Sequence, residues 1–175
     1  MTPGWSVGLL IALAAPAADP AADGAKVAPP VVHLAPSLAA WHGEWTGTGT
    51  AFGKPATAAL TIGHGPPRGR ATALSYRLTM EGSPSVAYSA EATYDVHAGG
   101  RVDGEWSDSR GRTRPASGGV KGATWWTHWG SADVEIGRST YVLEEGGTLA
   151  VSDSILQPDG SWRVFAMLRY RRTKG

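Results

Sequence analysis

The sequence of 175 residues contains no cysteine. Disulfide bonds, thiolate catalysis, cysteine-ligated zinc and iron–sulfur clusters are therefore excluded, and the redox compartment cannot be read from disulfides. Charge is also scarce, because charged residues make up 18% of the chain and the formal net charge is +1. So small a net charge gives no reason to expect nucleic acid or an anionic membrane as a partner.

The N-terminal part carries an uncharged apolar segment at residues 7–15. This segment is shorter than the roughly 20 residues of a membrane-spanning helix, so no membrane span is expected. Residues 15–17 (Ala-Pro-Ala) follow with the small-x-small pattern of a signal-peptidase site. Residues 1–17 are therefore interpreted as a signal peptide, which predicts a periplasmic or secreted protein. A disordered Ala/Pro tail on a cytoplasmic protein is the alternative.

The rest of the chain divides into a linker and one domain. Residues 18–37 are dominated by Ala, Pro, Gly and Asp and are predicted to be a disordered linker. Residues 38–175 are predicted to form a single domain, because nothing else in the chain is long enough for a second one.

What the sequence does contain in quantity is glycine, with 24 residues, and tryptophan, with eight. Glycine at this level indicates many turns, and tryptophan buries a large area per residue, which suits a barrel. From residue 42 onward apolar and polar residues alternate, most clearly in residues 71–80 and 86–96. The expected strands cover residues 44–52, 57–62, 71–80, 86–96, 101–106, 124–129, 132–136, 139–144, 149–156 and 162–171.

Strands at intervals of roughly 8–12 residues, with no helical pattern between them, favour an antiparallel all-β fold. A barrel is favoured over a sandwich because the well-patterned first and last strands can pair and leave no exposed edge. The prediction is an all-β, antiparallel up-and-down β-barrel of about eight to ten strands. A short N-terminal helical turn within residues 34–41 is expected to plug one end.

Gly43, Glu44 and Trp45 open the first strand, directly after this turn. They resemble the Gly-x-Trp signature of the lipocalin/avidin superfamily, the calycins. The resemblance implies that Gly43 and Trp45 help to close one end of the barrel. It also implies that a basic residue of the last strand packs over the Trp45 indole, and Arg169 and Arg171 are the candidates.

Two further segments, residues 105–111 and 159–172, resemble a bacterial lipocalin-like domain family of unknown function. This resemblance covers residues 38–172. It implies a bacterial, lipocalin-like barrel.

The densest chemical feature is the segment Thr-Trp-Trp-Thr-His-Trp at residues 124–129. On a strand, Trp126 and His128 share one face, whereas Trp125, Thr127 and Trp129 share the other. If Trp126 and His128 point inward, the barrel gains an aromatic wall with one polar group, as small-molecule sites commonly have. The other face stays open as the inward one.

The predicted ligand-binding set is Trp126, His128, Tyr88, Tyr76 and Trp106. Tyr76 and Tyr88 belong to it because they lie on the more apolar faces of neighbouring strands. The alternative for each of these side chains is that it fills the core and touches no ligand.

No histidine forms a His-x-His or His-Glu-x-x-His pair, so no metal site is predicted. Haem-binding small barrels use a histidine on a late strand, and the last two expected strands contain none. His128 would be the only substitute, and no cofactor is predicted.

Signals for catalysis are few. No Gly-x-Ser-x-Gly elbow occurs, and a single inward carboxylate such as Asp153 would act as a general acid only if burial raised its pKa. Arg110, Arg112 and Arg114 are interpreted as a solvated hairpin loop.

Three functions therefore stay open. The first is an exported barrel that binds a small hydrophobic or aromatic molecule. The second is a barrel enzyme of the cyclase or hydrolase type that uses an inward carboxylate or His128. The third is a filled barrel with a structural or partner-binding role. The barrel interior discriminates between them.

Overall fold

The computed structural model describes residues 37–65, 71–82, 87–131 and 135–174. The expected signal peptide (residues 1–17) and all but the last residue of the expected linker (residues 18–37) lie outside these residues. Within the described ranges, no helix is long and apolar enough to cross a membrane.

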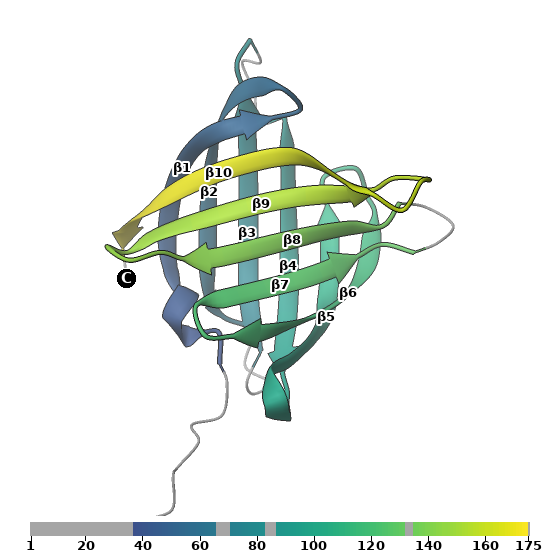
Figure 1. Ribbon diagram of the computed structural model, residues 1–175. Coiled ribbons are helices and arrows are strands. Elements are labelled where there is room, and N and C mark those ends of the chain that lie inside the picture. The colour runs from purple at the N-terminus through teal and green to yellow at the C-terminus, as the bar shows by residue number, and fades with distance from the viewer. Residues whose placement is uncertain (1–36, 66–70, 83–86, 132–134, 175) are drawn as a thin grey trace, which may run out of the picture. The chain divides into compact units, whose positions relative to one another are not determined.

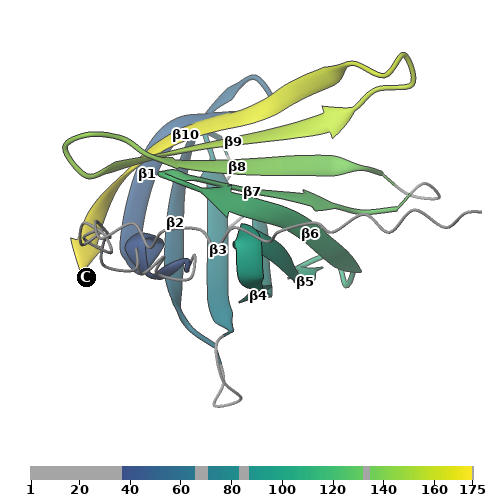
Figure 2. The same ribbon diagram turned by 60° about the horizontal axis from the view of Figure 1, so that its bottom comes forward.

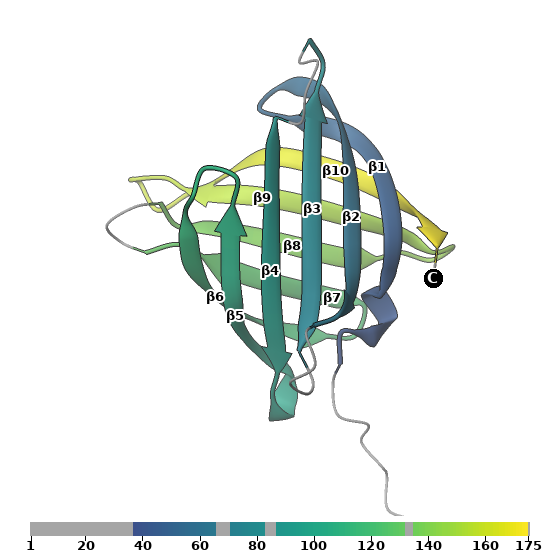
Figure 3. The ribbon, with the colours of Figure 1, turned by 180° about the vertical axis from the view of Figure 1, so that it is seen from behind.

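Ten antiparallel strands form one closed barrel, in which β1 pairs with both β2 and β10 (Figure 1). The strands are β1 (Gly43–Ala51), β2 (Lys54–His64), β3 (Thr72–Met80), β4 (Tyr88–Val96), β5 (Arg101–Asp108), β6 (Thr113–Lys121), β7 (Thr124–Trp129), β8 (Gly137–Leu143), β9 (Thr148–Leu156) and β10 (Trp162–Lys174). Seen from behind, β2 to β5 run in front of β7 to β10, so these two groups form opposite walls (Figure 3). The predicted all-β up-and-down barrel is confirmed.

One strand was missed in the sequence, and one was expected where none is described. β6 contains Pro115 and the pair Gly118-Gly119, residue types that ordinarily interrupt strands. Gly118 is required here, because a Cβ on it would lie 1.9 Å from the Trp126 carbonyl oxygen of β7. The strand expected at residues 132–136 is not observed at residues 135–136, and residues 132–134 lie outside the described ranges.

The barrel interior pairs large side chains with small ones across neighbouring strands. Tyr76 of β3 lies opposite Ala90 of β4, and Trp106 of β5 lies opposite Ala92. All four are buried. Because the neighbouring position carries only a methyl group, each ring has room to extend into the barrel.

One end of the barrel is closed by the helical turn η1 (Ala39–Trp41), which lies beside the start of β1 (Figure 2). Trp41 and Trp45 are both 1% exposed. The Trp45 indole Nε1 donates a hydrogen bond to the Trp41 carbonyl oxygen at 2.9 Å, which ties the turn to the first strand. Beneath them lies Trp125, whose ring is stacked on Tyr141 with centroids 4.3 Å apart. The expected plug is therefore made of packed aromatic side chains.

The cation over Trp45 is Arg172, with its guanidinium carbon 4.5 Å from the ring centroid. Arg169 and Arg171, the expected candidates, lie on the outer face, and Arg169 pairs with Glu144 there. Strand periodicity explains why Arg172 takes this position. Tyr170 is fully buried, and Arg172, two residues further along β10, lies directly opposite Trp45 in the register.

Candidate functional site

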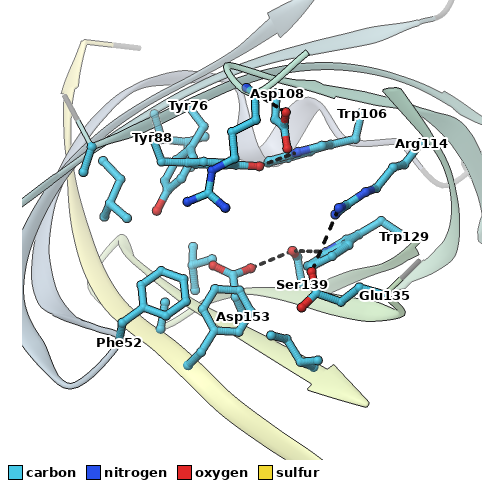
Figure 4. A pocket seen from close by; sticks show the side chains of 18 of the residues that line it. Phe52, Tyr76, Tyr88, Trp106, Asp108, Arg114, Trp129, Glu135, Ser139 and Asp153 are labelled. Atoms are coloured by element: carbon cyan, nitrogen blue, oxygen red, sulfur yellow. Dashed lines mark hydrogen bonds and ion pairs between the residues drawn. The ribbon is translucent and has the colours of Figure 1, made fainter. Parts of the chain in front are cut away.

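The half of the barrel away from η1 contains a cavity of about 170 Å³ (Figure 4). Its lining includes Phe52 at the β1–β2 turn and Arg110 and Arg112 at the β5–β6 turn. Phe52 is 57% exposed and both arginines are exposed, so the cavity reaches the surface at this end. For comparison, a protein cavity of about 150 Å³ with apolar walls admits benzene. The space is therefore suited to a molecule of one or two rings.

Three of the five predicted ligand-binding residues lie together on one wall of this cavity. Tyr76, Tyr88 and Trp106 come from the neighbouring strands β3, β4 and β5. The Tyr76 ring centroid is 6.2 Å from that of Tyr88 and 6.4 Å from that of Trp106. The Trp106 indole Nε1 donates a hydrogen bond to the Tyr88 hydroxyl at 3.0 Å. Contact of these rings with a ligand stays a prediction.

Trp126 and His128 do not line the cavity. The face of β7 that carries them points outward, contrary to the prediction. Trp126 packs on the outer surface near Gly119, and His128 lies beside Trp162, with ring centroids 5.8 Å apart. Trp125 and Thr127 are fully buried on the opposite face, with Trp129 next to them on the cavity. That face points inward because Trp125 fills the space under the closed end.

A chain of hydrogen bonds crosses the floor of the cavity. The Trp129 indole Nε1 donates to the Ser139 hydroxyl at 3.1 Å, and the Ser139 hydroxyl donates to Asp153 Oδ1 at 2.6 Å (Figure 4). The Ser139 hydroxyl has one proton to donate. It therefore accepts from the indole N–H, which can only donate, and gives its own proton to the carboxylate. Gly137 makes room for this arrangement, since a Cβ there would lie 2.1 Å from the Trp129 ring.

Asp153 is the one carboxylate on the inward face of β9, between Val151 and Ile155. It lies deep in the barrel, and what surface it keeps faces the cavity. Burial raises the pKa of Asp153 to about 6, although the hydrogen bond from Ser139 acts in the opposite direction. This group can therefore accept or release a proton near neutral pH, the property that a general acid or base requires.

Arg114 is the buried cation of the site. Its side chain is 9% exposed, and its guanidinium carbon lies 5.3 Å from the Trp129 ring centroid. The nearest carboxylate oxygen is Oε2 of Glu135, 4.0 Å from Nη2, and the buried Nε has no hydrogen-bond partner. The interpretation of Arg114 as part of a solvated loop was wrong. Only Arg110 and Arg112 belong to the turn. Arg114 is part of β6, where it lies opposite the inward Trp106 of β5.

No group of three or more potential metal ligands occurs among the residues that the structure describes. His42 and His64 do meet edge to face, with ring centroids 4.8 Å apart. They come from the start of β1 and the end of β2, beside the closed end, and neither lines the cavity.

Among the polar residues of the cavity, Asp153 was named in the sequence as a possible inward carboxylate, whereas Arg114 and Ser139 were missed. Strand periodicity supports an inward position for Asp153 and could have found Arg114. On β9, Leu149, Val151 and Ile155 alternate, and Asp153 occupies the remaining position of that row. On β6, Arg114 is two residues before the buried Ala116. Ser139 carries no such signal, because its role depends on contacts between strands, and Trp129 belonged to the face of residues 124–129 that was left open as the inward one.

No protein-family model matches this sequence, and no curated protein matches it either. The fold and the cavity define the class at a coarse level. The chain is a closed ten-stranded β-barrel with an interior cavity that could accept a ligand.

Proposed function

We propose that this protein is an exported, lipocalin-like barrel that binds a small aromatic or hydrophobic molecule in its cavity. The observation that carries the proposal is an aromatic wall of Tyr76, Tyr88 and Trp106 facing a polar floor across an unfilled space. Small-molecule sites combine apolar walls with a few polar groups in this way.

The lipocalin-like part of the proposal rests on the closed end. Trp45 lies under the cation of Arg172 and is tied to η1, an arrangement that the Gly-x-Trp resemblance implies. The ten strands exceed the eight of the lipocalins, so the likeness concerns end closure and barrel type. Export rests on the sequence pattern of residues 1–17 alone.

Filling the cavity tests the binding function. Val151 lines the cavity, and Val151→Phe adds a ring to it, whereas Ala150→Phe adds the same ring to the other face of β9. Calorimetric titration with indole should detect binding by the unsubstituted protein and by Ala150→Phe. Val151→Phe should weaken it by about tenfold or more, equivalent to about 1.4 kcal/mol. Equal binding by all three proteins would place the site outside the cavity.

A second function, a barrel enzyme, is favoured by one observation, the raised pKa of Asp153 beside the cavity. A buried carboxylate of this kind is a competent base once it is ionised. His128 is not a candidate for this role, because it lies outside the barrel.

The bicyclic probe 5-nitrobenzisoxazole loses a carbon-bound proton to a base, and its ring opening is followed by absorbance. Asp153 should accelerate this reaction, with the rate rising as pH passes about 6, and Asp153→Asn should remove the acceleration. The absence of any acceleration would contradict an accessible base at this position.

A further inference from the structure

Arg114 is a buried cation whose hydrogen-bonding capacity is unused. A guanidinium carries five N–H donors and stays protonated at every accessible pH. Among the described residues, no hydrogen bond reaches the Arg114 side chain, and its Nε is buried without a partner. Leaving a charged donor buried without a hydrogen-bond partner costs more free energy than leaving a neutral donor so.

The carboxylates around Arg114 do not satisfy it. Glu135 is 4.0 Å away, which is beyond hydrogen-bonding distance, and its side chain is 39% exposed. Asp108 Oδ1 accepts hydrogen bonds from the backbone N–H groups of Arg110 and Arg112, at 2.9 and 3.1 Å. Asp153 Oδ1 accepts the Ser139 hydroxyl.

The position of Arg114 fits a ligand with an anionic end. It is the first inward residue of β6 after the turn that carries Arg110 and Arg112, so it lies just inside the open end. Trp129 supports the face of its guanidinium, and Trp106 lies opposite in the register. A ring placed against Trp106 and Tyr76 would therefore have its substituent near the unpaired N–H groups (Figure 4).

We propose that the ligand is an aromatic carboxylate whose oxygens are bound by Arg114 while its ring lies on the aromatic wall. This inference rests on the proposed binding function and specifies its ligand. Paired N–H donors of an arginine match the two oxygens of a carboxylate.

A cationic ligand held by Asp153 is the competing arrangement, and the two charges differ in one respect. Asp153 Oδ1 already accepts the Ser139 hydroxyl proton at 2.6 Å, so this carboxylate has a hydrogen-bond partner inside the barrel. Arg114 keeps its charge, its buried Nε has no hydrogen-bond partner among the described residues, and its ion-pair partner Glu135 is 4.0 Å away and 39% exposed. This asymmetry favours an anion.

The experiment compares three probes of nearly equal shape on the full chain: 3-phenylpropanoate, 3-phenylpropanamide and 3-phenylpropylamine. Calorimetry at pH 7.5 should show the carboxylate binding about 10- to 100-fold more tightly than the amide, the range expected for charge-assisted hydrogen bonds. The amine should be the weakest of the three.

Arg114→Gln should abolish the preference for the carboxylate while retaining binding of the amide. Arg169→Gln is the matched control, since it removes the same charge from the outer surface, where Arg169 pairs with Glu144. That control should keep the full preference. Arg114→Lys, which retains the charge without the planar pair of donors, should keep part of it.

Several outcomes would overturn the inference. Equal binding of carboxylate and amide, or an unchanged preference in a folded Arg114→Gln variant, would refute it and leave the binding function intact. Tightest binding of the amine would assign the ligand's charge to Asp153 instead. Binding of none of the three probes would contradict both the inference and the proposed function.

Discussion

The Ser139 hydroxyl lies 2.6 Å from Asp153 Oδ1 and donates its proton to it. This contact gives the buried carboxylate a fixed partner inside an otherwise apolar row of β9. It also links the carboxylate to the Trp129 indole, which donates to the same hydroxyl. The floor of the cavity is therefore held in place before any ligand enters.

Ser139→Ala should raise the pKa of Asp153 above its value of about 6, because the hydrogen bond that favours the ionised form is lost. Carbon-detected NMR of the carboxyl group across a pH series measures this shift directly. Ser152→Ala, on the outer face of β9, is the control and should leave the titration unchanged. A pKa that stayed near 6 in Ser139→Ala would mean that the hydroxyl does not stabilise the charge.

The stability of the protein should fall as pH rises from about 4 to about 6. The pKa of Asp153 is raised from 3.8 to about 6 in the folded protein, so the folded state holds this proton over a range in which the unfolded state has released it. The loss saturates above pH 6 and amounts to roughly 3 kcal/mol.

Asp153→Asn should abolish this slope, because the amide does not titrate while its oxygen still accepts the Ser139 proton. Denaturant unfolding at pH 4 and at pH 7.5 provides the measurement. The variant should equal the unsubstituted protein at pH 4 and exceed its stability at pH 7.5. A variant less stable at pH 7.5 would show that the ionised carboxylate stabilises the fold.

Arg172→Ala should destabilise the protein by roughly 1 kcal/mol, through loss of the cation over Trp45 and of the hydrogen bond from Nη2 to the Ala40 carbonyl oxygen. Arg171→Ala, at an exposed neighbouring position, should change stability by less than about 0.5 kcal/mol. Chemical denaturation of the two variants compares them. A larger effect of Arg171→Ala would restore the original expectation for barrel closure.

Gly137→Ala should destabilise the barrel by roughly 1–3 kcal/mol, since its methyl group would lie 2.1 Å from an atom of the Trp129 ring. Displacing that ring also breaks the hydrogen bond to Ser139. Gly63→Ala is the control, because nothing lies within 4 Å of the added carbon. Thermal unfolding of both variants should show a lowered midpoint for Gly137→Ala alone.

The barrel could be predicted because strand periodicity is local. Leu74, Tyr76 and Leu78 alternate with polar residues in a stretch bounded by turns, and the structure buries all three. The same local rule failed on β6, where Pro115 and two glycines replace the apolar pattern. Gly118 and Gly119 are explained by the close approach of Trp126 on β7, which no single segment reveals.

The site was harder to predict because side-chain direction on β7 is set by its surroundings. Both faces of this strand carry tryptophan, so alternation alone does not choose between them. The choice is made by Trp41 of the helical turn and Tyr141 of β8, which pack on Trp125. Arg114 likewise could be read as a solvated charge, because its burial depends on Trp129 and Trp106 from other strands.

Intermolecular nuclear Overhauser effects can show whether a small aromatic molecule occupies the cavity. Unlabelled indole bound to isotope-labelled protein should give cross-peaks to the ring protons of Tyr76 and Trp106. It should give none to Trp126 or His128, which lie on the outer face. Cross-peaks confined to Trp126 and His128, or none at all at saturating indole, would show that the cavity does not bind the aromatic molecule.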